Sequence, residues 1–193
     1  FESVDTIPVA TAKEDERDLL VNLKEKRTGQ LMLGAGISSE EAVSGTLELT
    51  QSNFDVTNWP HFTGAGQRLR LRLQLGTEHT DALLSFSEPW LFDRPLRLDW
   101  DLYAREREYD QYTEERLGTR VMLTRALGTY WRHSFGLRLE AIELSDFDAA
   151  LSPELLAEED DYITNGMIQR LVRDTRDRYV NPSRGSRLSL SAE

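Results

Sequence analysis

The sequence predicts an all-β fold in which about nine strands follow one another as an antiparallel up-and-down meander. Three observations carry this prediction. Apolar and polar residues alternate with a period of two in most segments, as in strands that have one apolar and one polar face. Such segments, each of roughly 8–12 residues, recur between turns from residue 31 to the end of the chain. Long helical patterns are scarce.

The first 28 residues differ from the rest. Two short strands are predicted, Phe1–Thr6 and Asp18–Lys24, with a highly charged turn between them. They resemble the closing strands of a small α/β module that precedes the meander. The stretch Glu25–Gly29, EKRTG, is the expected junction, so residues 1–28 and 29–193 are predicted to be separate units.

The meander begins with a weakly alternating strand, Leu31–Gly36 (LMLGAG). The clearest strand is Arg68–Leu75 (RLRLRLQL), where four Leu residues share one face and Arg and Gln share the other. The same alternation predicts further strands at Thr46–Thr50 (TLELT), Arg97–Leu102 (RLDWDL), Phe135–Glu140 (FGLRLE) and Arg187–Ser191 (RLSLS).

The connections between these strands alternate in character. One set is polar and acidic: SSEEAVSG, GTEHTD, REREYDQYTEER and the long LSDFDAALSPELLAEEDDYITNG. The other set is richer in aromatic residues and Pro: SNFDVTNWPHFTGAG, SEPWLFDRP and RALGTYWRH. Successive turns of a meander lie at opposite ends of the sheet, so its two ends are expected to face different surroundings.

Two architectures fit this pattern, because a soluble β-sandwich and a membrane β-barrel share the same alternation with opposite faces in water. The predicted strands approach the ~9–11 residues that a tilted transmembrane strand needs, whereas sandwich strands are nearer ~5–6. Aromatic residues also gather at one set of strand ends, as in a membrane-interface girdle or a plugged sandwich end. These residues are Trp59, Phe62, Trp90, Phe92, Tyr130 and Trp131. The pattern favours the barrel and leaves the sandwich open.

Composition excludes several classes of function. The net charge is −11 and the Arg residues are interleaved with acids, which argues against nucleic-acid binding because phosphate neutralisation needs a clustered basic surface. Cysteine is absent, so no disulfide, thiol nucleophile or Cys-type zinc site is expected. No run approaches the ~18 apolar residues of a transmembrane helix. The chain opens with FESVDT, without Met or a signal-peptide pattern, and is expected to be a piece of a longer protein.

Enzyme chemistry is not expected, and no cofactor or metal is predicted. The three His residues, His61, His79 and His133, lie far apart without metal-ligand spacing. No Gly-x-Ser-x-Gly elbow occurs, and GAGQRLR at Gly64 precedes a strand rather than a helix. The acidic run at residues 158–161 lacks the spacing of an EF-hand and is expected to be a solvated loop. Within that loop, Ser152 and Pro153 would start a short helix.

Several ordered stretches resemble the BamA family, whose members form the central barrel component of the outer-membrane protein assembly machinery. They are EKRTGQLMLGAGISSEEAVSGTLELTQSNF, GAGQRLRLRLQLG, LSFSEPWLFDRPLRLDWDLYARE and DTRDRYVNPSRGSRLSL. The resemblance covers essentially the whole chain, and the ordered set is more specific than any one motif. The later Val-Arg-Gly-Tyr/Phe motif of the family and its closing strands are missing.

The resemblance implies the tail of the last POTRA domain in residues 1–28 and the first part of a sixteen-stranded transmembrane β-barrel in residues 29–193. It implies an outer-membrane location, with the POTRA tail and the aromatic turns periplasmic and the acidic loops extracellular. The family folds and inserts other barrel proteins, so the implied partners are unfolded outer-membrane protein clients, assembly-complex lipoproteins and outer-membrane lipid. The alternatives are a POTRA-barrel protein that secretes polypeptides and a soluble β-sandwich binding module.

Two sets of residues become candidates through this resemblance. The first barrel strand would form a weak seam at which client strands pair, because Gly weakens a strand; its candidate residues are Leu31, Leu33, Gly34 and Gly36. Relief of crowding at a barrel corner is the other reading of these glycines. The second set comprises turn residues that resemble family motifs: Asn53, Phe54, Glu88, Pro89, Trp90, Asp174, Asn181, Pro182, Arg184 and Gly185.

The Asn-Pro-Arg-Gly stretch at residues 181–185 is predicted to be a turn between the eighth and ninth strands. Pro182 is expected to end strand pairing and to push Asn181 toward an extended conformation. Gly185 would supply a positive φ. Ion pairs among Arg176, Asp177, Arg184 and Arg187 are expected to hold the turn closed, each contributing at most ~1 kcal/mol when exposed.

Overall fold

The computed structural model describes residues 3–10, 17–24, 27–38, 42–147 and 162–193. These residues form two antiparallel sheets. The smaller sheet is the hairpin of β1 (Ser3–Ala10) and β2 (Arg17–Lys24). The larger sheet has nine strands, each paired with its neighbours in sequence. The predicted all-β up-and-down meander is therefore confirmed.

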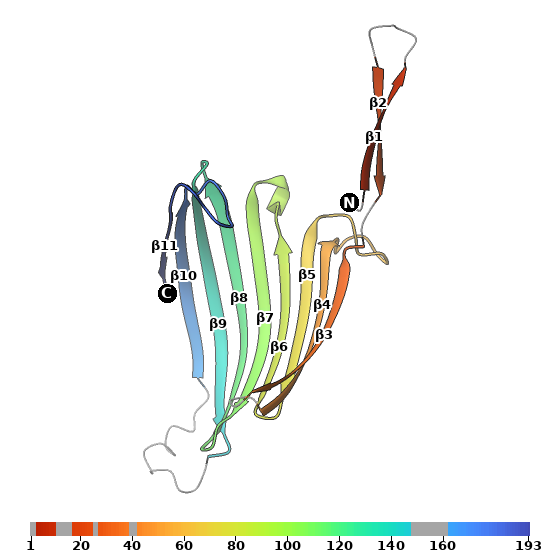
Figure 1. Cartoon of the computed structure of the whole chain (residues 1–193). Helices are drawn as coiled ribbons and strands as arrows, with labels where there is room; N and C mark the ends of the chain where they lie inside the picture. Colours follow the sequence, from red (N-terminus) through yellow and green to blue (C-terminus); the bar gives the residue numbers. More distant parts are fainter. Residues whose placement is uncertain (1–2, 11–16, 25–26, 39–41, 148–161) are drawn as a thin grey trace.

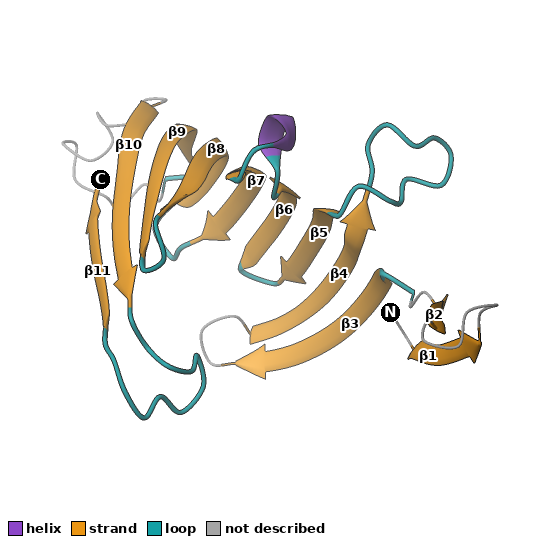
Figure 2. Ribbon diagram, turned by 90° about the horizontal axis from the view of Figure 1, so that it is seen from above, coloured by secondary structure: helices purple, strands orange, loops and turns teal. Residues whose placement is uncertain are grey.

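The large sheet runs from β3 at one edge to β11 at the other, and it is strongly curved (Figure 2). Its strands are β3 (Gly29–Ser38), β4 (Ala42–Phe54), β5 (Gln67–Gly76), β6 (His79–Glu88), β7 (Leu96–Glu108), β8 (Thr113–Leu127), β9 (Trp131–Ser145), β10 (Tyr162–Asp174) and β11 (Arg187–Ala192). A short 3₁₀ turn, η1 (Leu91–Asp93), lies between β6 and β7. Because strands β3 to β11 form one continuous sheet rather than two facing sheets, the sandwich alternative is wrong for this part of the chain.

The strands in the second half of the sheet are longer than the sequence analysis predicted. The segment REREYDQYTEER was expected to be a loop, but β7 continues to Glu108 and β8 begins at Thr113. The ladder between them includes Arg107 opposite Glu114 and Arg105 opposite Arg116. Charged residues therefore continue both strands, because backbone pairing does not depend on apolar side chains. The predicted helix at Ser152 and the acidic run at residues 158–161 lie outside the described residues.

The register separates the sheet into two faces. Directly opposed residues share a face, and one row that crosses β3 to β9 is almost entirely leucine. We call this side the leucine face; the row contains Leu31, Leu49, Leu71, Leu84, Leu102, Thr119 and Leu139. The other side, the polar face, carries a row that includes Glu48, Arg72, Tyr103, Gly118 and Glu140.

Burial on the two faces is inverted relative to a water-soluble sheet. The buried side chains among the described residues all lie on the polar face: Tyr103, Ser134, Glu140, Ile168 and Val172. Large apolar side chains on the leucine face are exposed instead, and Leu33 reaches 73% and Ile37 85%. Monomeric soluble proteins rarely expose a contiguous apolar surface of this extent. The leucine face therefore requires an apolar surrounding.

The β1–β2 hairpin lies beyond the end of the large sheet at which β4–β5, β6–β7, β8–β9 and β10–β11 connect (Figure 1). We call this the hairpin end. One face of the hairpin carries Val4, Leu19, Val21 and Leu23, all exposed. An isolated hairpin with an uncovered apolar face is marginal in water, so these strands require packing against further structure.

Among the described residues, the structure contains no helix that is long and apolar enough to cross a membrane.

Candidate functional site

Strand β3 forms one edge of the large sheet, and among the described strands it pairs only with β4. Leu31 and Leu33 lie on the leucine face, while Gly34 and Gly36 lie on the polar face opposite Thr46 and Ser44. A Cβ added at Gly34 would come 3.9 Å from Thr46 Cβ, and one at Gly36 would come 3.5 Å from Ser44 Oγ. Both are ordinary contacts, so neighbouring described residues do not require glycine at either position.

The turn between β4 and β5 is held by backbone and amide contacts of Asn53. Its carbonyl oxygen accepts a hydrogen bond from the Gly64 amide at 3.1 Å, and its Oδ1 accepts one from the Gly66 amide at 2.8 Å. Phe54 stacks on Phe62, with ring centroids 5.8 Å apart, and meets Phe86 edge-on at 6.3 Å. The family-like Asn-Phe pair therefore shapes this turn and fixes it on β6.

The turn between β6 and β7 is organised by Glu88. Its carboxylate accepts hydrogen bonds from the Trp90 amide at 2.8 Å and from Gln67 Nε2 at 2.7 Å. Pro89 follows directly, and Trp90 is exposed. Phe92 in η1 has a φ of +57° and is 82% exposed. A bulky residue seldom adopts this backbone conformation, so the turn holds an aromatic ring outward at a conformational cost.

The turn between β10 and β11 differs from the prediction in the backbone conformation of Asn181. Asn181 has a φ of +51° rather than an extended conformation; Asn tolerates this region, and the chain must reverse there. Past the strands, backbone bonds join Thr175 to Ser186 and Asp177 to Arg184, and among the described residues Pro182 forms none. These contacts agree with the prediction that pairing ends at Pro182.

The contacts that close this turn also differ from the expected set of ion pairs. Arg176 pairs with Asp174, Nη2 lying 2.8 Å from Oδ2, and among the described residues Arg184 and Arg187 form no ion pair. Asp177 accepts hydrogen bonds from the Ser183 hydroxyl and from the Ser183 and Arg184 amides, the last at 3.1 Å. The positive φ predicted at Gly185 is confirmed, at +88°.

The acid stability of this turn is expected to depend on Asp177. The Ser183 hydroxyl and then the Arg184 amide hold the pKa of Asp177 below its ordinary value. A lowered carboxyl pKa stabilises the turn above the ordinary value of ~4, and this contribution is lost as the pH falls through the lowered pKa. Hydrogen exchange at Ser183 and Arg184 should be slower than in Asp177→Asn at pH 6. The difference should vanish near pH 2; a difference that persists unchanged there would contradict this role.

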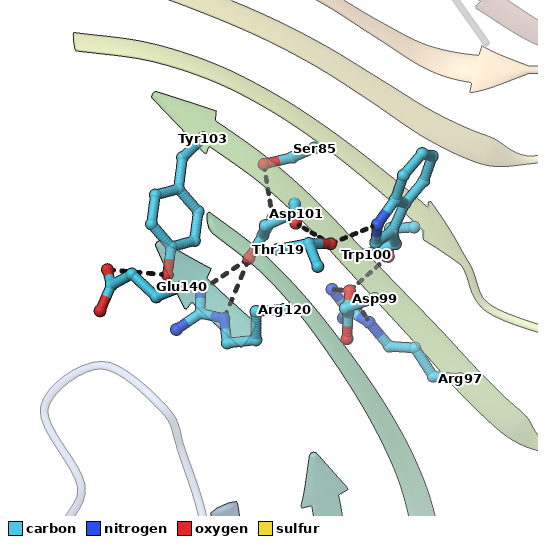
Figure 3. A network of polar contacts seen from close by, with 10 residues as sticks. Ser85, Arg97, Asp99, Trp100, Asp101, Tyr103, Thr119, Arg120 and Glu140 are labelled. Carbon is cyan, nitrogen blue, oxygen red and sulfur yellow. Dashed lines mark hydrogen bonds and ion pairs between the residues drawn. The ribbon is translucent and has the colours of Figure 1, made fainter. Parts of the chain in front are cut away.

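The polar face carries a network of charged side chains between neighbouring strands (Figure 3). Asp101 on β7 accepts hydrogen bonds from Ser85 Oγ on β6 at 2.7 Å and from Arg120 Nη2 on β8 at 2.6 Å. Asp99 likewise accepts from Ser87 Oγ at 2.7 Å and from Arg97 Nη2 at 2.6 Å. These contacts join β6, β7 and β8 across the polar face.

Tyr103 forms the most enclosed contact of this face. Its ring lies over Gly118 on β8, and its hydroxyl donates a hydrogen bond to Glu140 Oε1 on β9 at 3.2 Å. Tyr103 is 8% and Glu140 5% exposed. Arg116 and Arg138 place guanidinium nitrogens 3.8 and 3.9 Å from Glu140 Oε2. The ring thus covers a buried carboxylate and joins three strands.

On the leucine face, the polar side chain of Thr119 in the middle of β8 has its hydrogen bonds satisfied. Thr119 Oγ1 accepts a hydrogen bond from Trp100 Nε1 at 2.9 Å and donates one to the carbonyl oxygen of Asp101 at 3.1 Å. Figure 3 shows the Trp100 indole directed to this pair. Neither polar group is left unsatisfied on an apolar surface, as such a surface demands.

Sequence reasoning missed Tyr103, Gly118, Glu140 and Gln67. A signal existed for Tyr103, which is an aromatic residue at a polar-face position of an alternating strand. Gly118 in mid-strand was a second signal, since glycine there marks a close approach. Their pairing was not readable, because it depends on the register between β7 and β8.

The comparison with protein families identifies the family to which this strand arrangement belongs. Residues 61–193 match the Omp85 superfamily domain. The chain belongs to the Omp85 superfamily. Within it, the chain is similar to the outer membrane protein assembly factor BamA of Nitratidesulfovibrio vulgaris, with 30% identity over 188 residues that cover 96% of this chain and 22% of that protein. It is also similar to BamA of Neisseria meningitidis serogroup B, with 24% identity over 153 residues, 76% of this chain and 18% of that protein.

The fold of this Omp85 chain is shared with a solved structure, the BamA of Haemophilus ducreyi lacking POTRA domains 1–3. The TM-score is 0.67 at 19% identity, and the match covers 99% of this chain and 38% of that one. The resemblance to BamA found in the sequence is thereby confirmed. The chain spans about a fifth of the length of the curated relatives it matches.

Proposed function

We propose that this chain is part of an outer-membrane β-barrel that folds and inserts other outer-membrane proteins. The observation that carries the proposal is the exposed leucine face, continuous from β3 to β9, on a sheet whose buried side chains lie on the polar face. Lipid-facing apolar residues opposite a polar interior are the pattern of transmembrane barrels. The similar proteins are named outer membrane protein assembly factors, which supports the insertion role.

In this function the sheet curves into the barrel wall, and the hairpin end faces the periplasm. The β1–β2 hairpin then forms the tail of a POTRA domain, whose remaining elements cover its apolar face. Exposed aromatic side chains at the hairpin end, among them Trp59, Trp90, Phe92 and Tyr130, suit a membrane interface. Clients, assembly lipoproteins and membrane lipid are the proposed partners.

Strand β3 is the proposed seam, which opens so that clients pair by adding a strand to its edge. Gly34 and Gly36 contribute flexibility here, because glycine has greater backbone freedom and no side chain to pack. Crowding is not the reason for glycine, since the described neighbours leave room for a Cβ at both positions. No covalent chemistry is involved: the backbone N–H and C=O groups of an edge strand supply the recognition.

Replacing Gly34 and Gly36 together by Val in the full-length protein is expected to slow client assembly, because β-branched residues stiffen the seam strand. The measurement is the yield of folded client barrels, seen as the heat-modifiable band on electrophoresis, in cells that depend on the variant. Gly45→Val on the inner strand β4 is the control, since a Cβ there likewise makes only an ordinary contact, at 3.9 Å from the Leu75 carbonyl oxygen. Unchanged client yield in the double variant would remove the seam role from these glycines.

A further inference from the structure

The leucine face is not uniform near the hairpin end, where it contains an apolar groove of about 530 Å³. One row of its floor crosses four strands and consists of Leu69, Phe86, Trp100 and Val121. The other residues lining the groove are Phe54, Val56, Leu84 and Leu98. Three strand spacings of ~4.8 Å make the floor about 14 Å wide.

Phe54 and Val56, at the start of the β4–β5 turn, line one side of the groove, which we call its roof. Phe54 contacts Phe86 edge-on, and the Val56 amide donates a hydrogen bond to Gln67 Oε1 at 3.2 Å. Gln67 in turn donates from Nε2 to Glu88 at 2.7 Å. The Gln67 side chain therefore ties the β4–β5 turn to Glu88 at the end of β6 and holds Val56 beside the groove.

The residues that line the groove are apolar, whereas a carboxylate lies beside it. Trp100 presents carbon to the groove, because its indole N–H is engaged by Thr119. Glu88 does not line the groove, but it lies beside it on the leucine face, directly opposite the lining residue Leu98. Its two carboxylate oxygens accept hydrogen bonds from Gln67 and Trp90, and among the described residues no Lys or Arg forms an ion pair with it.

We propose that this groove is a binding site for one phospholipid, with an acyl chain under the β4–β5 roof and an amine-bearing headgroup at Glu88. The proposal rests on the proposed function, which places the leucine face in lipid. The groove continues that lipid-facing surface, and its all-apolar lining suits an alkyl chain. The Glu88 carboxylate, which has no basic partner among the described residues, is complementary to a primary ammonium group. A choline headgroup also carries a cation, but that cation has no N–H donors.

The test uses the full-length protein in phosphatidylcholine vesicles that contain a trace of phospholipid with a photoreactive diazirine on the acyl chain. The probe carries either an ethanolamine or a choline headgroup, and labelled peptides are mapped by mass spectrometry. We expect labelling concentrated at Phe54, Val56 and Phe86, and about threefold stronger with the ethanolamine probe, a factor typical of an exposed ion pair.

Variants separate the site from general lipid contact. Leu84→Trp fills the groove, and Val56→Glu charges its exposed roof without touching the sheet; both should remove the concentrated labelling. Leu117→Trp, on the leucine face outside the groove, should leave it unchanged. Glu88→Gln should make the two headgroups equivalent.

Two results would overturn the proposal. One is labelling spread along the leucine face in proportion to exposure, which shows bulk lipid contact only. The other is concentrated labelling that is equal for the two headgroups and is unchanged by Leu84→Trp. Absence of labelling anywhere on the leucine face would instead overturn the membrane location on which the proposed function depends.

Discussion

Gly118→Ala is expected to destabilise the folded barrel by on the order of 2–4 kcal/mol, through overpacking and loss of a hydrogen bond to a buried carboxylate. A Cβ at this position would overlap the ring of Tyr103. The ring must then move away from β8, and its hydroxyl leaves Glu140. Urea unfolding of the full-length protein in lipid vesicles measures the change.

A double-mutant cycle tests the mechanism of this loss. In a Tyr103→Ala background, Gly118→Ala should cost nothing, because the colliding ring is gone. Gly45→Ala is the matched strand control, with its nearest neighbour 3.9 Å away. Equal destabilisation by Gly118→Ala with and without Tyr103 would show that the ring is not the cause.

Gly185→Ala is expected to disrupt the β10–β11 turn by more than the cost of its backbone conformation alone. At a φ of +88° a side chain is strained by roughly 1–2 kcal/mol. An added Cβ would also overlap the backbone carbonyl of Thr175, and this atom cannot turn aside as a flexible side chain can. The overlap should add on the order of 1–3 kcal/mol.

Gly128→Ala separates these two costs. Gly128 has a φ of +72° in the β8–β9 turn, but an added Cβ meets nothing within 4 Å. The free energy of unfolding of Gly128→Ala should be lowered by the conformational cost only. That of Gly185→Ala should be lowered further, and its Arg184 amide should lose protection from hydrogen exchange. If both variants lose the same free energy of unfolding, the positive φ alone accounts for the effect of Gly185→Ala.

The order of the strands was predictable, and the reason is physical. A period of two is the signature of a strand with two unlike faces, and short turns between such segments leave antiparallel neighbours as the simplest pairing. Arg68–Leu75 lies within β5, and Arg97–Leu102 lies within β7. Strand ends were harder: REREYDQYTEER resembles a loop in composition, although most of it is paired.

The turns were predicted less well than the strands. The positive φ of Gly185 was predictable because glycine alone tolerates such positions at little cost. The partners of the charged residues were not predictable, since Arg176 has an acid on either side, Asp174 and Asp177, and only the folded turn selects Asp174. Asn181 departed from the local preference before proline because the closure of the whole turn dominated it.

By itself, the sequence determined the strand order and the unlike composition of the two faces, because both follow from local alternation along the chain. It could not decide which face is buried, since alternation is the same in water and in lipid. The tertiary structure decided that point: curvature and register bury Glu140 beneath Tyr103 and leave Leu33 and Ile37 exposed. Burial depends on which strands lie side by side, and that arrangement exists only in the folded sheet.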